Sequence, residues 1–167
     1  MEKIYFAKVK EEAVIPSKRE EDGCYDVYAC FDEEYISIMP NDIKMIPTGI
    51  ASAFTSNYRM GVRERGSTGT KGMSVRAGQI DSGYRGEWFI PINNTSNKII
   101  IIAKDIEKIK DELGLSEEHA TIYPYTKAIA QVALEKVPTV NVEEISFNEL
   151  QQIKSERGDG KLGSSNK

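Results

Sequence analysis

The sequence has few of the residues on which a zinc site, a disulfide framework or a nucleic-acid-binding surface would depend. Its 167 residues include one histidine and two cysteines, Cys24 and Cys30. A disulfide framework or a zinc site would need more ligands, so we expect both cysteines to be reduced. The formal net charge of −4 argues against a protein that binds nucleic acid directly through its phosphates. Any phosphate binding must come from a few placed basic groups.

Long apolar runs are also missing. The densest apolar stretch, residues 99–103, is far shorter than a membrane span. Residues 1–6 lack the apolar stretch and the small-residue cleavage site of a signal peptide. We therefore expect a cytoplasmic protein without membrane contact, of a length that suits one domain.

Short apolar segments separated by turns run along most of the chain. They occupy residues 4–9, 35–39, 44–47, 49–54, 58–62, 88–92, 99–103 and 128–137. Within 88–92, the side chains of Trp88, Ile90 and Ile92 fall on one face of a strand. Such spacing predicts an all-β fold, either a sandwich, a jelly roll or a barrel.

One segment departs from this pattern. Between residues 104 and 113, Ile106, Ile109 and Leu113 have helical spacing, and Gly114 can end the helix. We expect a short amphipathic helix inserted between strands, with these three side chains buried against the barrel or a partner and its charged residues solvated.

The C-terminal region changes in composition. Ser146 followed by Glu149 is a capping-box pattern and predicts a second short helix. Residues 154–167 are rich in glycine and hydroxyl groups and include Arg157. A segment of this kind is mobile until something orders it. It is either a flap that closes over phosphate or a frayed terminus.

The most informative segment is 78–86, where three glycines in nine residues indicate a sharply bent hairpin. Asp81 and Tyr84 would flank the same spot. A carboxylate beside an aromatic ring suits a general base with a stacking platform for a flat ligand. The alternative is a plain hairpin in which Asp81 forms the turn and Tyr84 packs in the core.

Residues 65–72 offer Arg65, hydroxyl groups and exposed amides in one loop, which are groups that hold phosphate oxygens. Thr70 and Gly72 stand where a Walker loop requires glycine and a hydroxyl residue, so a P-loop is not predicted. The alternative is a polar turn.

Two polar residues lie in otherwise apolar strands. Asp26 is either a turn cap, an edge charge or a group that binds a hydrated divalent ion. Gln131 needs partners if it is buried, either backbone groups or a ligand.

Taken in order, these five segments resemble the five motifs of the trimeric dUTPase family, over residues 23–165. The insertion at about 104–123, between the third and fourth motifs, resembles phage and Firmicute members in its location. The resemblance implies a jelly-roll-like β-barrel of the β-clip type over residues 1–153, with a short inserted helix. It also implies a flexible C-terminal arm, residues 154–167, that closes the active site.

The resemblance further implies a homotrimer that hydrolyses dUTP to dUMP and pyrophosphate with Mg²⁺. This reaction keeps uracil out of DNA and supplies dUMP. Asp81 matches the carboxylate that activates the water, which attacks the α-phosphorus. Tyr84 matches the aromatic residue that packs against the deoxyribose. The hairpin backbone at Gly78, Gln79 and Ile80 matches the slot that reads uracil.

The remaining matches concern the phosphates and the metal. Arg65, Gly66 and Ser67 match the phosphate loop, and Gln131 matches the strand that touches the phosphate chain. Asp26 matches the residue that holds Mg²⁺ through water. In the arm, the matching residues close over a site that commonly belongs to a neighbouring subunit; they are Arg157, Leu162, Ser164 and Ser165.

Several positions depart from the family pattern. Gly66 replaces a serine, Ala128 replaces an arginine, and Leu162 replaces the aromatic residue that stacks over uracil. Cys24 and Gly83 also differ from the motif residues. These departures concern substrate affinity more than the type of reaction.

Two alternatives remain open from the sequence. A dCTP deaminase shares the fold and a similar phosphate site, but the Asp81 hairpin and the arm favour a dUTPase. The second alternative is a phage regulatory protein that binds a repressor through the insertion, which would make residues 104–123 a site for a protein partner.

Overall fold

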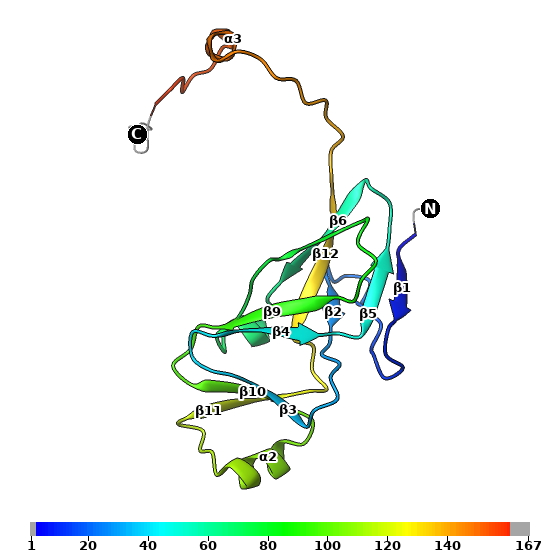
Figure 1. Ribbon diagram of the computed structural model, residues 1–167, viewed down its shortest axis with the longest axis vertical. Coiled ribbons are helices and arrows are strands. Elements are labelled where there is room, and N and C mark those ends of the chain that lie inside the picture. Colours follow the sequence, from blue (N-terminus) through cyan, green and yellow to red (C-terminus); the bar gives the residue numbers. More distant parts are fainter. Residues whose placement is uncertain (1–2, 161–167) are drawn as a thin grey trace. The chain divides into compact units, whose positions relative to one another are not determined.

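The computed structural model describes residues 3–160. The chain separates into two compact units, Met1–Val137 and Pro138–Lys167, and each is described by itself. The first unit contains the strands and two of the helices (Figure 1). The division into a core of residues 1–153 and an arm of residues 154–167 that closes the active site stays a prediction.

The first unit is built from short strands, as predicted. They are β1 (Tyr5–Lys8), β2 (Tyr25–Val27), β3 (Tyr35–Ile38), β4 (Ile43–Pro47), β5 (Ile50–Ala53), β6 (Tyr58–Arg63), β7 (Met73–Val75), β8 (Gln79–Asp81), β9 (Phe89–Asn94), β10 (Ile99–Ala103), β11 (Ala120–Pro124) and β12 (Ala130–Lys136). The helices of the chain are α1 (Gly66–Gly69), α2 (Ile106–Leu113) and, in the second unit, α3 (Phe147–Gln152).

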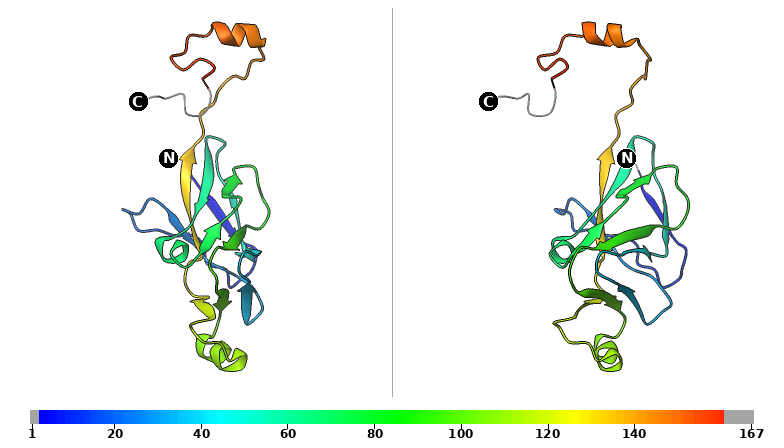
Figure 2. Two further views of the ribbon diagram at one scale, coloured as in Figure 1. Left: turned by 90° about the vertical axis from the view of Figure 1, so that its left-hand side faces the viewer. Right: turned by 60° about the vertical axis from the view of Figure 1, so that its left-hand side comes forward.

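The strands form small sheets (Figure 2). A main apolar core lies among them, and a second, smaller apolar cluster lies between α2, β10 and β11. The strand orders of the sheets are β2-β12-β6-β8, β4-β9-β7, β11-β10-β3 and β1-β5. This arrangement confirms the predicted all-β, jelly-roll-like fold. The first of these sheets contains three of the predicted site residues, Asp26, Gln131 and Asp81.

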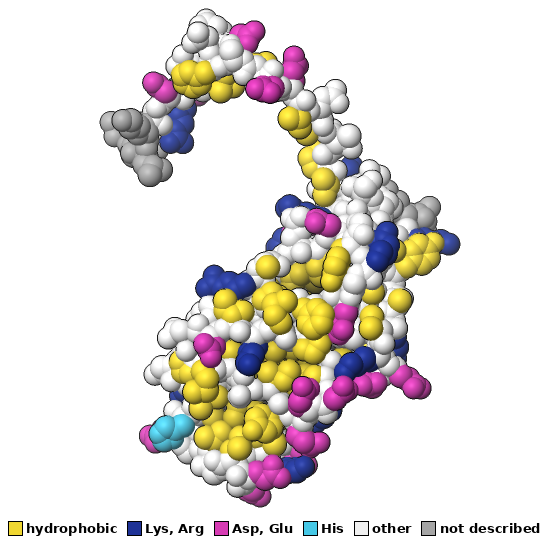
Figure 3. All heavy atoms as spheres, viewed as in Figure 1, with side chains coloured by type: hydrophobic (Ala, Val, Ile, Leu, Met, Phe, Trp, Pro, Cys, Tyr) yellow, Lys and Arg dark blue, Asp and Glu magenta, His cyan; other side chains and the backbone are white. Residues whose placement is uncertain are grey.

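Strand β9 shows how the sequence pattern produces the core. Trp88, just before the strand, and Ile90 and Ile92 within it are each 1% exposed or less, whereas Phe89 is 43% exposed. The predicted alternation is confirmed. Phe89 is part of an exposed apolar patch with Ile43 and Met45 of the neighbouring strand β4, visible in Figure 3.

The inserted segment is folded against the barrel. Asp105 caps the start of α2, and Gly114 ends it in the left-handed conformation, as predicted. Ile109 is buried with residues of β10 and β11. Leu113 is 39% exposed in the single chain, so the barrel does not bury it, and burial by a partner stays a prediction. Strand β11, which pairs in parallel with β10, was not predicted. Residues 120–123 therefore belong to a sheet.

The second unit contains the other predicted helix. Ser146 caps α3, and the reciprocal bonds between Ser146 and Glu149 complete the capping box. Its apolar side chains Phe147, Leu150 and Ile153 are exposed. No helix within residues 3–160 is both long and apolar enough to cross a membrane.

Candidate active site

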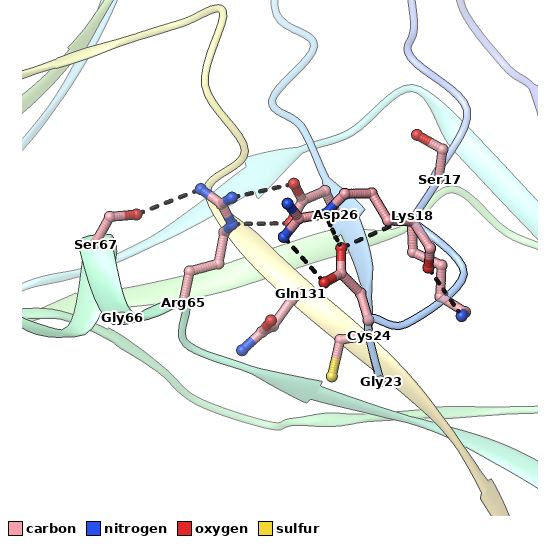
Figure 4. A pocket seen from close by; sticks show the side chains of 11 residues that line it. Ser17, Lys18, Gly23, Cys24, Asp26, Arg65, Gly66, Ser67 and Gln131 are labelled. Carbon is pink, nitrogen blue, oxygen red and sulfur yellow. Dashed lines mark hydrogen bonds and ion pairs between the residues drawn. The ribbon is translucent and has the colours of Figure 1, made fainter.

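A polar cavity of about 800 Å³ lies beside strand β2. Asp26 reaches it from β2, Gln131 from β12, and Arg65, Gly66 and Ser67 from the start of α1 (Figure 4). Three of the five predicted motifs therefore meet in one place. The register explains part of this meeting, because Gln131 is the partner of Asp26 across the β2–β12 pair.

The ion pair between Asp26 and Arg65 organises the cavity. Arg65 Nε lies 2.8 Å from Asp26 Oδ1, and Arg65 Nη2 lies 3.1 Å from Asp26 Oδ2. Two parallel contacts fix the plane of the guanidinium. A third nitrogen, Nη1, donates to Ser67 Oγ at 3.3 Å, so Asp26 and Ser67 flank the guanidinium (Figure 4).

The loop that carries Arg65 is itself held by Glu64. The Glu64 carboxylate accepts hydrogen bonds from the Val75 backbone N–H at 2.7 Å and from Ser74 Oγ at 3.1 Å. Its own backbone N–H and that of Val75 hold the pKa of this carboxyl below its ordinary value. Gln131 Nε2 donates to the Glu64 carbonyl at 2.7 Å, so the backbone bond predicted for Gln131 is present.

The segment before β2 supplies cavity residues that sequence reasoning missed. Lys18 Nζ donates to the carbonyls of Arg19 and Glu20, and Arg19 forms a two-point pair with Asp22. This pair raises the pKa of Arg19 and lowers that of Asp22. Residues 18–22 form a mixed charge run, which usually indicates a solvated surface. The other lining residues of the segment are Ser17, Gly23 and Cys24.

The Asp81 hairpin forms a second, smaller cavity of about 300 Å³. It is lined by Gln79, Ile80, Asp81 and Tyr84 and by apolar residues of β4 and β9. Gly78 is required here, because a Cβ would lie 2.7 Å from the Val62 carbonyl oxygen. Tyr84 is 47% exposed and donates its hydroxyl to the Glu87 carbonyl at 3.0 Å, so it is not a core residue.

The two cavities lie apart in one chain. Asp26 lies opposite Gln131, Gln131 lies opposite Arg63, and Asp81 lies opposite Arg59. Asp26 and Asp81 are therefore separated by three strand spacings across the sheet and by four residues along β6, which amounts to about 20 Å. A single chain therefore does not bring Asp81 to Arg65.

The arm residues belong to the second unit. Arg157 is exposed, and its Nε donates to the Gly160 carbonyl at 3.2 Å. Leu162, Ser164 and Ser165 lie outside the described residues.

The cavity suits a hydrated magnesium ion better than a protein-enclosed one. Within residues 3–160, no group of three or more His, Cys, Asp or Glu side chains could enclose a metal. Magnesium typically keeps several waters and uses one or two carboxylates together with substrate phosphates. Each Asp26 oxygen accepts one bond from Arg65 and retains capacity for a second, so Asp26 can accept from a metal-bound water.

Comparison with known proteins identifies several relatives. The dUTPase family model matches residues 10–108. A deoxyuridine 5'-triphosphate nucleotidohydrolase of Nautilia profundicola is 30% identical over 169 residues, which cover 99% of both chains. The enzyme of the same name from Leptospira interrogans is 31% identical over 104 residues, covering 60% of this chain and 71% of its own.

Solved structures agree in fold. The dUTPase of Staphylococcus bacteriophage 80alpha, in complex with dUPNHPP, matches with a TM-score of 0.72 and 20% identity over 99% of both chains. A mutant dUTPase of Staphylococcus aureus phage phi11, in which a structural Mg(II) ion is coordinated, matches with a TM-score of 0.66 and 19% identity. That match covers 87% of this chain and 99% of the phage protein.

Proposed function

This chain belongs to the dUTPase family, and from that premise we propose that it hydrolyses dUTP to dUMP and pyrophosphate. Water adds to the α-phosphorus, and the bond from that phosphorus to the bridging oxygen of the pyrophosphate breaks. One observation carries the proposal: the cavity in which Asp26, Arg65, Ser67 and Gln131 converge has the charge and the hydroxyl groups that a triphosphate requires.

Arg65 provides fixed positive charge for the phosphate chain. Because Asp26 holds two nitrogens of the guanidinium, its plane is set before the nucleotide arrives. Ser67 lies on the other side of the guanidinium and offers a hydroxyl, while Gly66 leaves its backbone accessible. Gln131 holds the loop through the Glu64 carbonyl and lines the same cavity.

The magnesium ion proposed for this reaction would be held by the Asp26 carboxylate through water. When bound, it neutralises charge on the phosphates and stabilises the leaving pyrophosphate. The phi11 dUTPase coordinates a structural Mg(II) ion, so a protein of this fold can hold magnesium, but the assignment to Asp26 rests on the geometry of this cavity.

Asp81 is the proposed general base. It is exposed at the end of β8, where its carboxylate can accept a proton from the attacking water. Tyr84, also exposed, packs against the deoxyribose, and the backbone of residues 78–80 reads the uracil ring.

The distance between the two cavities supports a site that is shared between copies of the chain. Asp81 lies about 20 Å from Asp26 within one chain, too far for both to act on one nucleotide. The Asp81 cavity is also lined by Met45 and Phe89, which belong to the exposed apolar patch on β4 and β9. Such a patch is typical of a protein–protein interface. We therefore propose a homotrimer in which Asp81 of one copy completes the phosphate site of another.

The arm supplies the final part of the proposed site. Arg157, Ser164 and Ser165 close over the γ-phosphate of a neighbouring copy, and Leu162 covers the base. Closure after binding excludes water late in the cycle and adds positive charge where the pyrophosphate leaves.

Two further assignments accompany this proposal. A cytoplasmic location stays a prediction. A protein partner at residues 104–123 stays a prediction; α2 and β11 line a separate cavity of about 470 Å³ there.

Hydrolysis of a nucleotide panel tests the function. We expect pyrophosphate release from dUTP with Mg²⁺, little release without it, and at least tenfold slower release from the four standard deoxynucleoside triphosphates. Release of ammonia from dCTP would instead indicate a deaminase of the same fold. Equal release from dTTP and dUTP would contradict the proposed reading of uracil.

A further inference from the structure

The side chain of Gln79 contacts the carboxylate of Asp81. The two residues are two positions apart on β8 and therefore lie on the same face of the sheet. Gln79 Nε2 donates to Asp81 Oδ1 at 2.7 Å. The side chain of Gln79 thus has a contact that its proposed backbone role in reading uracil does not need.

Arg59 fixes the orientation of the Gln79 amide. Arg59 Nη1 donates to Gln79 Oε1 at 3.0 Å. Because an arginine can only donate, the oxygen of the amide must face Arg59, and the NH₂ group must face Asp81. This arrangement distinguishes the two ends of an amide that otherwise look alike.

Arg59 is held in turn by Glu135 on β12. Arg59 Nε lies 3.0 Å from Glu135 Oε2, and Arg63 pairs with the other oxygen of Glu135. Bonds from Arg63 and Arg59 lower the pKa of Glu135, which keeps it charged. Gly61 makes room for this carboxylate, since a Cβ there would lie 2.6 Å from Glu135 Oε1.

We infer that Gln79 is a positioning residue that holds the Asp81 carboxylate for the attacking water; this inference rests on the proposed function of Asp81 as the base. The bond to Oδ1 restrains rotation of the carboxylate and directs Oδ2 to the water. Gln79 is neutral, so it orients the carboxylate without neutralising it. A cation in direct contact would stabilise the charged form and make it a weaker base. The amide therefore separates Asp81 from the charge of Arg59.

The test compares Gln79→Met, Asp81→Asn and the double variant. Methionine keeps the length of the side chain and removes both polar atoms. We expect Gln79→Met to lower kcat for dUTP roughly tenfold with KM within about twofold, because one orienting hydrogen bond is lost. Lys136→Met, at an exposed position of the same sheet, is the matched control and should leave kcat unchanged.

The double variant shows whether Gln79 acts through Asp81. In the Asp81→Asn background there is no base to position, so we expect Gln79→Met to change the residual single-turnover rate less than twofold. The same roughly tenfold fall in both backgrounds would overturn the inference, as would a Gln79→Met variant with wild-type kcat. If Asp81→Asn itself hydrolysed dUTP within a few-fold of wild type, the proposed function of Asp81 would fail instead.

A second variant covers the case in which Gln79→Met does not fold. Gln79→Glu keeps an oxygen for Arg59 but cannot donate to Asp81 when ionised. We expect the same kcat fall with KM preserved and a melting temperature close to wild type. Wild-type kcat in Gln79→Glu would show that the donated hydrogen bond is dispensable and would overturn the inference.

Discussion

Asp26 and Arg65, on different elements and 39 positions apart in the chain, meet in a two-point ion pair at 2.8 and 3.1 Å. Their side chains are 32% and 30% exposed, so the pair faces a cavity and is not isolated from solvent. Asp26 orients the guanidinium and would also accept from metal-bound water in the proposed site, which would give one carboxylate two tasks.

Arg65→Lys tests the orientation of the guanidinium. Lysine keeps the charge but loses the two-point geometry with Asp26, so we expect kcat/KM for dUTP to fall roughly 100-fold. Steady-state pyrophosphate release measures the effect. In the comparison variant Arg19→Lys, we expect at most about a threefold change, because Arg19, although it lines the same cavity, is 88% exposed and its pair with Asp22 lies in solvent. Equal losses in the two variants would mean that charge alone matters at Arg65.

Glu64→Gln tests how the phosphate loop is held. The pKa of Glu64 is lowered in the folded protein, so its contribution is fully present above the ordinary value of 4.5 and is lost as pH falls below it. We expect Glu64→Gln to be less stable than wild type at pH 7. The difference in free energy of unfolding should shrink between pH 5 and about pH 3. Urea unfolding measures it, and a difference that is independent of pH would contradict the role of the charged carboxylate.

Ile109→Ala tests the insertion as a folded part of the first unit. Ile109 is fully buried between α2 and the sheet, so its truncation should destabilise the protein by about 2–5 kcal/mol. Leu113→Ala, at a 39% exposed position, should cost roughly 1 kcal/mol or less. Both variants should keep wild-type kcat below their melting temperatures. A large loss of kcat in folded Ile109→Ala would place the insertion in the active site.

Truncation after Ile153 tests the arm. The removed residues include one large apolar residue, Leu162, so we expect an unchanged melting temperature and retained nucleotide binding. Hydrolysis should become at least tenfold slower, and Arg157→Ala should reproduce most of that loss. Binding of a non-hydrolysable dUTP analogue and pyrophosphate release separate the two effects. Full activity without the arm would contradict its role as a closing flap.

The sequence predicts which residues form the candidate site better than it predicts where the fold places them relative to one another. The short alternating strands and the ordered motifs predict the all-β fold and the residues that meet at Asp26 and Arg65. Strand β11 was missed because parallel pairing with β10 is a non-local contact. Lys18 and Arg19 were missed because runs of charged residues usually lie on a solvated surface. The position of residues 18–22 beside the cavity depends on the tertiary fold.

The relation between the two cavities depends on strand register. Asp81 and Asp26 lie on the same four-stranded sheet, but neither residue's local sequence specifies how far apart the pairing places them. For the same reason, the contact between Gln79 and Arg59 follows from the β6–β8 register and not from the motif itself.

The most direct test of the account is to combine two inactive chains. Asp81→Asn lacks the base, and Arg65→Met lacks the phosphate contact, and each should be nearly inactive alone. If Asp81 of one copy serves the phosphate site of another, trimers formed by co-expressing equal amounts of both chains contain intact sites. Random assembly gives such a site about one time in four, so we predict roughly a quarter of wild-type activity. Mixed trimers as inactive as the parent variants would contradict the shared site.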